Sequence, residues 1–285
     1  MRWILRMGEV LLKSRPVRRF MRKALEKHII AQVEVRGAKV KIRPWQGMLF
    51  LDLIEGDSEV VEDALRHSFG LISADPISSV DVDPAIVAAS VISNAPKEEG
   101  ATFAVQCKRH GQKGEWTSQT FAGATGAAVL EKVELGVNLS QPDWEIRVAL
   151  FPDKARLLGQ RFMGPGGLPS GVQGLVMAHL ETEEDVLCAW LMMHRGCRIQ
   201  PVEGTGEQLK SWDPALVSEE YAERLVTGPG RDRSPSPWGI VAHHLPDAPT
   251  TIGEDENVRT PLVNLEPLVG WSEQEIELLR SRVFS

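Results

Sequence analysis

Residues 164–196 decide the fold class of the C-terminal part of this sequence: GPGGLPSGVQGLVMAHLETEEDVLCAWLMMHRG. Glycine and proline dominate positions 164–169 and predict a rigid linker that cannot be helical. The apolar run at 172–179 predicts a strand, and the length and apolar content of residues 183–195 favour a helix. A strand, a turn and a helix in this order are the repeating unit of α/β domains.

The turn between that strand and that helix is the first candidate site. Such a turn often holds a phosphate, because free backbone N–H groups and the helix dipole favour an anion. The backbone approaches a phosphate closely only where the turn contains glycine. This turn has no glycine, and its residues are Leu180, Glu181, Thr182, Glu183, Glu184 and Asp185. Its last three carboxylates satisfy the helix dipole themselves and would repel a triphosphate. We expect a turn that keeps the position of a phosphate loop without its chemistry, and an acidic helix start rather than a cation site.

Length and composition limit the class of protein. The 285 residues are enough for two or three domains. No apolar run approaches the roughly 20 residues of a membrane span, and the N-terminus lacks the apolar segment of a signal peptide. The three cysteines, Cys107, Cys188 and Cys197, form no CxxC pair. We therefore expect no disulfide framework, no metal site, no membrane partner and a cytoplasmic location.

The net charge of −7 hides a strong asymmetry along the chain. Residues 1–45 contain thirteen Lys and Arg against three acids, a balance of +10, so the remainder carries −17. A basic N-terminal segment on an acidic body indicates a local surface for a polyanion.

The N-terminal segment predicts a compact α+β domain. Ser14 is placed to cap a helix over SRPVRRFMRKALEKHII, with Pro16 in its first turn. Spacings of three and four place Val17, Phe20 and Met21 on the apolar side of this helix, and basic residues occupy much of the rest. The other expected elements are strands at 3–7, 32–36, 39–42, 48–53 and 71–79, and helices at 57–68 and 84–95. Apart from one extra strand before the second helix, residues 3–79 follow a β-α-β-β-α-β order, which predicts a ferredoxin-like fold.

Two further units are expected after it. A strand at 102–109 ends in the basic tip Lys108, Arg109 and His110, and a helix follows from Thr117 or Ser118 through Leu130. Two strands joined at Pro152–Asp153 precede the linker. The last unit adds a strand at 197–202, a helix at 215–227, a strand at 237–243 and a helix at 272–283 capped by Ser272. We place the domain boundaries at 1–98, 99–168 and 169–285.

Six stretches, in order, resemble the tRNA 4-thiouridine synthetase family. They are GEVLLKSRPVRRFMRKAL, FAVQCKRHGQ followed by TSQTFAGATGAAVLE, VNLSQPDWEIRV, GPGGLPSGVQGLV, AWLMMHRG and PLVNLEPLVGWSEQEI. The resemblance implies an N-terminal ferredoxin-like domain and a THUMP RNA-binding domain, followed here by a reduced α/β domain of the PP-loop type. It also implies a tRNA partner, held near its acceptor end.

The third domain departs from the family pattern. The family's phosphate loop resembles S-G-G-x-D-S, and the six positions here, Leu180–Asp185, lack both glycines and both serines. The later segment that carries the family's catalytic cysteine is also not found, so no catalytic residue is assigned. We expect a tRNA-binding protein without adenylation activity or a cofactor, whose C-terminal domain pairs with itself or docks a separate catalytic protein. The alternative is an active sulfurtransferase that uses ATP and magnesium at a nucleotide site rebuilt or completed by a partner.

The candidate RNA contacts lie on the first helix and at the basic tip of the second unit. They are Lys13, Arg15, Arg18, Arg19, Arg22, Lys23, Lys108 and Arg109. A-form RNA is recognised mainly through its shape and backbone, so a basic surface serves this role. His243 and His244 are interpreted as an ordinary strand end, and Trp212, Trp238 and Trp271 as core or interface anchors.

Overall fold

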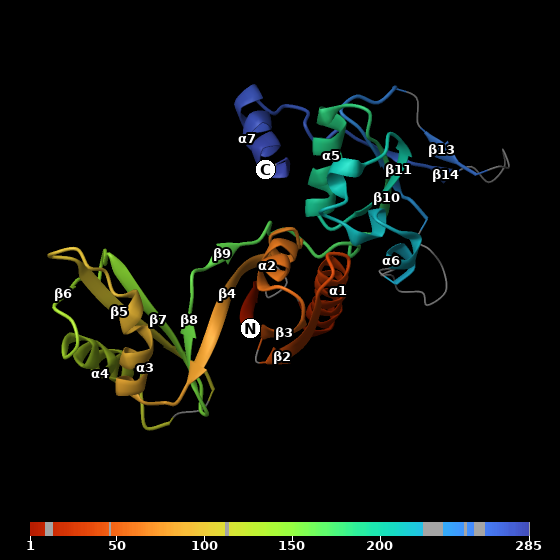
Figure 1. The fold of residues 1–285 in the computed structure, drawn as a ribbon. Helices are drawn as coiled ribbons and strands as arrows, with labels where there is room; N and C mark the ends of the chain where they lie inside the picture. Colours follow the sequence, from red (N-terminus) through yellow and green to blue (C-terminus); the bar gives the residue numbers. More distant parts are fainter. Residues whose placement is uncertain are drawn as a thin grey trace. The chain divides into compact units, whose positions relative to one another are not determined.

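A computed structural model describes residues 1–8, 14–45, 47–111, 114–224, 236–247, 250–253 and 260–284 (Figure 1). The chain divides into two compact units. One combines residues 1–4 with 75–161, and the other combines residues 5–74 with 162–285. Three domains were expected from the sequence, whereas here the N-terminal and C-terminal parts of the chain pack into one unit.

The first 80 residues follow the expected β-α-β-β-α-β order. The elements are β1 (Arg2–Met7), α1 (Arg15–Glu34), β2 (Lys39–Trp45), β3 (Met48–Glu55), α2 (Ser58–Arg66) and β4 (Leu71–Val80). The strands lie in the order β2-β3-β1-β4, and β2 and β3 are antiparallel. The ferredoxin-like prediction is confirmed.

The expected strand at 32–36 is wrong, because α1 continues through Glu34. Gln32 and Val33 are fully buried on this last turn of the helix. The alternation of valine with polar residues resembles a strand locally, but burial of the helix face outweighs that weak local preference. Gly37, with φ of 85°, then turns the chain into β2.

The unit that contains residues 75–161 is built from a sheet and two helices. Its elements after β4 are α3 (Pro84–Val91), a 3₁₀ turn (Ile92–Asn94), β5 (Thr102–Arg109), α4 (Ser118–Leu130), β6 (Gly136–Val137), β7 (Trp144–Leu150) and β8 (Ala155–Leu158). The strand order is β4-β8-β7-β5-β6, with β5 and β7 parallel. Helix α3, which the predicted boundaries assign to the first domain, shares a buried core with α4 through Val87, Phe121 and Val129.

A buried carboxylate on β4 binds two arginines of this unit. Asp75 is fully buried and accepts hydrogen bonds from Arg147 at 2.9 Å and from Arg161 at 3.0 Å. A buried charge is stable only when it is paired and hydrogen-bonded, so these two arginines fix β7 and the end of the unit to β4.

The C-terminal part is an α/β layer, as expected. Its main elements are β10 (Leu175–His179), α5 (Glu183–His194), β11 (Arg198–Glu203), β12 (Gly239–Val241), β15 (Val263–Leu265) and α7 (Glu273–Val283). The short β9 (Phe162–Met163) precedes them and pairs antiparallel with β4. Strands β11, β10, β12 and β15 form a parallel sheet in that order. Shorter elements are η3 (Glu207–Leu209), η4 (Pro214–Leu216), α6 (Glu219–Arg224), β13 (Thr251–Ile252) and β14 (Thr260–Pro261). The expected helix at 215–227 is therefore a 3₁₀ turn followed by the short α6, and residues 225–227 lie outside the described residues.

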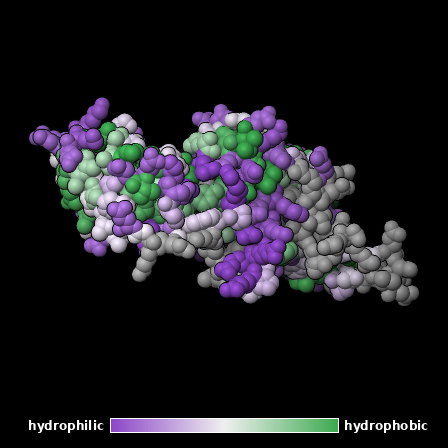
Figure 2. Space-filling model, turned by 90° about the horizontal axis from the view of Figure 1, so that it is seen from below, coloured by the Kyte–Doolittle hydropathy of each residue, from purple (hydrophilic) through white to green (hydrophobic). Residues whose placement is uncertain are grey.

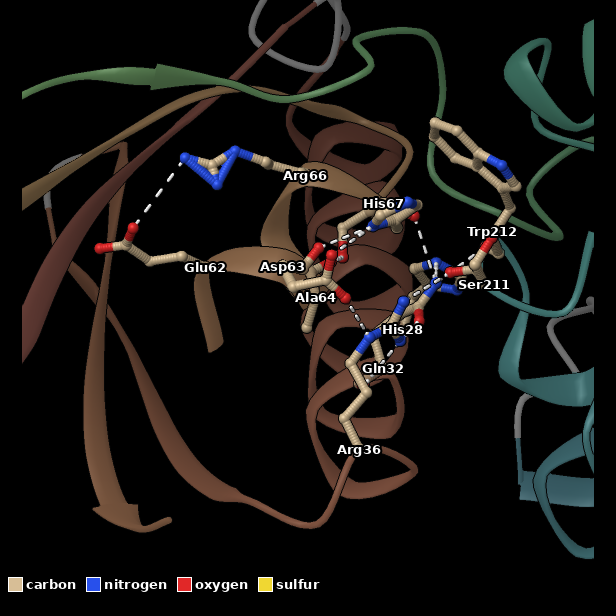
Figure 3. A network of polar contacts seen from close by, with 11 residues as sticks. His28, Gln32, Arg36, Glu62, Asp63, Ala64, Arg66, His67, Ser211 and Trp212 are labelled. Atoms are coloured by element: carbon tan, nitrogen blue, oxygen red, sulfur yellow. Dashed lines mark hydrogen bonds and ion pairs between the residues drawn. The ribbon is translucent and has the colours of Figure 1, made fainter. Parts of the chain in front are cut away.

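Polar contacts join α1 to the C-terminal part (Figure 3). The buried Gln32 amide donates to the Trp212 carbonyl oxygen at 2.9 Å and to the His67 carbonyl oxygen at 3.2 Å. The Arg36 guanidinium donates to the Ser211 carbonyl oxygen at 2.9 Å. Removing one of these donors would leave a buried carbonyl without a partner, so the contacts hold α1 in a fixed position against residues 211–212.

An aromatic cluster buries the same junction. Phe69 lies edge-on to Trp190, with ring centroids 5.4 Å apart, and stacks on Trp212 at 5.3 Å. All three side chains are buried, and offset or edge contacts between such rings add to their area burial. Phe69, which follows α2, is thus part of the same buried core as α5.

A buried histidine in this junction predicts a pH dependence of stability. Burial, with smaller effects from Arg198 and Arg36, lowers the pKa of His28 to about 4 against the opposing charge of Asp213. The unfolded chain therefore binds a proton between pH 6.5 and pH 4 that the folded chain does not, so stability falls as the pH drops through this window. We expect about 2 kcal/mol to be lost between pH 8 and pH 5.

Urea unfolding of the wild type and of His28→Gln at both pH values measures this loss. The variant lacks the titrating ring. Between pH 8 and pH 5 its unfolding free energy should therefore fall by about 2 kcal/mol less than that of the wild type. An identical pH dependence in both proteins would contradict the assignment.

No helix within the described ranges is long and apolar enough to cross a membrane. On the face drawn in Figure 2, hydrophilic and hydrophobic residues are interspersed among the coloured residues.

Candidate nucleic-acid interface

The first candidate surface is the N-terminal half of α1. Arg15, Arg19 and Lys23 are exposed, whereas Arg18 and Arg22 are partly buried. The exposed three recur every four residues, so they form one stripe that advances about 6 Å per step. Within the described residues none of these three has an acid at ion-pair distance. Lys13, the remaining candidate on this segment, lies outside the described residues.

The stripe borders a hollow that contains an aromatic ring. Arg15, Pro16, Arg19, Phe20 and Lys23 line a hollow of about 500 Å³. Phe20 is 41% exposed, so the ring meets solvent between the cations. Cations supply phosphate contacts and an exposed ring supplies a stacking surface, which is the combination that nucleic-acid surfaces use.

The exposure of Phe20 corrects the sequence analysis. Val17 and Phe20 were expected on the buried face of the helix with Met21, yet Val17 is 40% exposed and only Met21 is buried. The first turns of α1 extend past the core that covers its later turns, where Leu25 and Ile29 are fully buried. The spacing of apolar residues does not reveal where a helix leaves its core.

The start of α1 attracts anions. The helix has no acidic residue in its first turn, and the Ser14 side chain makes no capping hydrogen bond. The backbone N–H groups there keep their positive dipole end, beside Arg15 and Arg19. Arg22 differs from these residues, because it forms an ion pair with Glu26 at 3.2 Å within the helix.

The second candidate surface lies at the end of β5, in the other unit. Lys108 is exposed and Arg109 is partly buried, with its backbone N–H bonded to the Ser118 hydroxyl at 3.0 Å. His110 stacks on Phe151, with ring centroids 4.9 Å apart, and Arg109 and His110 line a hollow of about 270 Å³. Each surface is a separate basic and aromatic patch within its own unit.

The turn at 180–185 is closed by contacts within the chain. Thr182 caps α5, and its hydroxyl and backbone N–H both donate to the Asp185 carboxylate. The other Asp185 oxygen accepts the His243 backbone N–H at 2.7 Å. Burial acts to raise the pKa of Asp185, but these hydrogen bonds outweigh it and hold the pKa below its usual value. The carboxylate is therefore charged and occupies the place at the helix start where a phosphate would sit.

A cation from the C-terminal helix completes the closure. The Arg280 guanidinium of α7 pairs with Glu183 at 3.1 Å and with Glu184 at 2.8 Å. Leu180 is buried and Glu181 is exposed, so neither offers a phosphate contact. The sequence analysis did not anticipate Arg280, which lies almost a hundred residues away in the chain and has no local signal.

The cysteines are unsuited to nucleophilic chemistry. Burial raises the pKa of Cys107 and Cys197 to about 11 and that of Cys188 to about 12. The thiolate is the reactive form, so these three thiols are inert near neutral pH. Within the described ranges, no cluster of three or more His, Cys, Asp or Glu residues is suited to a metal ion.

Comparison with known proteins places the two N-terminal folds in named families. The ThiI ferredoxin-like domain matches residues 2–74, and the THUMP domain matches residues 86–158. The chain is a THUMP-domain relative of the tRNA sulfurtransferases. A probable tRNA sulfurtransferase of Methanosarcina acetivorans is 32% identical over 209 residues, which cover 70% of this chain and 50% of that protein. A probable tRNA sulfurtransferase of Methanocaldococcus jannaschii is 29% identical over 203 residues, which cover 68% and 53%. The chain thus spans about half the length of the curated relatives it matches.

Two solved structures share the fold. PH1313 from Pyrococcus horikoshii superposes with a TM-score of 0.73 at 21% identity, covering 99% of each chain. A 4-thiouridine synthetase, solved in complex with RNA and bound ATP, superposes with a TM-score of 0.71 at 18% identity, covering 99% of this chain and 85% of the other. The predicted ferredoxin-like, THUMP and α/β architecture is confirmed by these matches.

Proposed function

We propose that this chain binds tRNA and does not adenylate it. The observation that carries the proposal is the stripe of Arg15, Arg19 and Lys23 around the exposed Phe20, on a chain whose remaining residues are strongly acidic. These three cations have no acid at ion-pair distance among the described residues, and they gain affinity for a phosphate backbone by releasing its counterions. The acidic balance of the rest of the chain disfavours RNA binding away from its basic patches.

Relatives supply the class of RNA. The curated relatives carry the name tRNA sulfurtransferase, and the 4-thiouridine synthetase of similar fold was solved with RNA. We infer that the ligand here is tRNA, gripped near its acceptor end by α1 and by the Lys108–Arg109 tip. The three free cysteines, two of them buried, and the RNA partner favour a cytoplasmic place of action.

Ultraviolet cross-linking tests the proposed contacts. The full chain is irradiated with purified tRNA, and the modified peptides are identified by mass spectrometry. We expect adducts on the α1 peptide that contains Phe20 and on the peptide that contains Lys108 and Arg109. Adducts confined to other segments would contradict the proposed surface.

The proposed lack of adenylation rests on the start of α5. Asp185, Glu183 and Glu184 fill this helix end, and Arg280 neutralises the last two from within the chain. A triphosphate would have to displace these contacts and would meet three carboxylates at the same point. We propose that this domain serves as a scaffold, which pairs with a second copy or docks a separate catalytic protein.

ATP with magnesium should leave thermal stability unchanged. A ligand at about 100 times its dissociation constant adds about 2.7 kcal/mol to the native state, which raises Tm by several degrees. We expect a shift below about 1 °C at about 5 mM ATP with magnesium, measured by differential scanning fluorimetry. An ATP-binding PP-loop enzyme provides the positive control. A rise of several degrees would revive the alternative, an active sulfurtransferase with a rebuilt nucleotide site.

A further inference from the structure

A hollow of about 690 Å³ opens on the C-terminal part, away from the candidate phosphate turn. Three of its lining residues, Gln173, Cys197 and Trp238, each stand one or two residues before a strand of the parallel sheet. Others, from Leu191 to Arg195, belong to the last turn of α5 and its end. The hollow therefore lies at the amino edge of the sheet, whereas the turn at 180–185 lies at the opposite end of α5.

Two exposed tryptophans line the hollow. Trp238 is 40% exposed and Trp271 is 38% exposed. The Trp238 ring N–H donates to the Gln173 carbonyl oxygen at 2.9 Å, which fixes the orientation of the ring. Large rings held in place but left in water offer a flat surface for another ring to stack on.

The rest of the lining is aromatic and cationic. Trp190 and His194 lie nearly parallel, with ring centroids 5.3 Å apart and an angle of 12° between the rings. The Arg282 guanidinium lies 5.2 Å from the centre of the Trp190 ring and donates to the Pro165 carbonyl oxygen. The His194 ring contacts the same carbonyl oxygen at 3.1 Å. These side chains are held in place by one another before any ligand enters.

The charge of the hollow is positive. Arg195 is exposed and forms no ion pair within the described residues, and Arg282 adds a second cation that burial partly strips of water. None of the described lining residues is Asp or Glu. A partly desolvated guanidinium attracts an anion more strongly than one in bulk water.

We propose that this hollow binds a nucleotide, with the base against Trp238 and Trp271 and the phosphate at Arg195 and Arg282. The volume is in the range of small-molecule sites, and the lining combines a stacking surface with two cations. The nucleotide is either an unpaired one of a bound RNA or a free mononucleotide. Only the first source rests on the proposed tRNA binding.

Titration of the full chain with two probes tests the proposal. The probes are uridine 5′-monophosphate and a five-nucleotide oligouridylate, followed by tryptophan fluorescence and by isothermal calorimetry. We expect saturable binding of at least one probe. Trp271→Leu and Arg195→Glu should each weaken it about tenfold, because each removes one stacking or one phosphate contact. Both side chains are exposed, so both variants should fold. Lys210→Glu, a charge reversal in the same part of the chain but outside the hollow, is the matched control and should bind as the wild type does.

Binding of both probes with equal loss in the variants identifies an RNA nucleotide, and binding of the mononucleotide alone identifies a free ligand. No saturation by either probe at about 10 mM, or an affinity in both variants equal to that of the wild type, overturns the proposal. These results are separable from tRNA binding. A chain that binds tRNA but neither probe refutes the hollow alone, and one that binds a probe but no tRNA refutes the proposed function alone.

Discussion

Reversing the charges of Arg15, Arg19 and Lys23 together to Glu is expected to lower tRNA affinity at least a hundredfold near 0.1 M salt. Each reversal removes a phosphate contact and adds a repulsion, and these three side chains are the exposed ones among the candidate residues described on α1. The slope of log affinity against log salt should become shallower by about 2 to 3, because close to one counterion is released per phosphate contact and three contacts are removed. Filter binding across a salt series measures both effects.

A second triple reversal separates local contact from overall charge. Lys97, Lys132 and Lys210 lie elsewhere on the chain, and their change to Glu alters the net charge by the same amount. This control should bind tRNA within a few-fold of the wild type. Equal losses in the two variants, or no loss in the first, would contradict α1 as the binding surface.

Phe69→Ala is expected to destabilise the unit that contains α1 and α5 by about 3–5 kcal/mol. The side chain is fully buried between Trp190 and Trp212, so truncation leaves a cavity and removes two aromatic contacts. Urea unfolding followed by tryptophan fluorescence measures the change.

Phe20→Ala is the matched control for this loss, since it makes the same truncation at an exposed site. It should alter stability by less than about 1 kcal/mol and weaken tRNA binding instead. If Phe69→Ala changed stability as little as Phe20→Ala does, the N-terminal and C-terminal parts would not share a core.

The sequence predicts the order and type of most elements, for physical reasons that are local. The helix starts predicted at Thr117 or Ser118 and at Ser272 coincide with capping boxes in the structure. The end of α1 is missed because Gln32 and Val33 alternate like a strand, and their burial depends on residues distant in the chain. The packing of residues 5–74 with 162–285 in one unit is likewise a long-range property.

The candidate site is predicted in part. Its basic residues form a charge cluster that can be seen in the sequence. Only the structure shows that Arg15, Arg19 and Lys23 are exposed while Arg18 is partly buried. The ion pairs of Arg280 with the turn at 180–185 could not be predicted either, because they join residues far apart in the chain. Of the tryptophans interpreted as core or interface anchors, Trp212 is buried in the core, whereas Trp238 and Trp271 are exposed beside a hollow and so are not core residues.

The most direct test of the account is tRNA binding by the purified full chain across a salt series, with and without ATP and magnesium. The account predicts binding that weakens steeply with salt and is indifferent to ATP. Binding that depends on ATP would contradict the proposed loss of adenylation, and the absence of salt-sensitive binding would contradict the proposed role in RNA recognition.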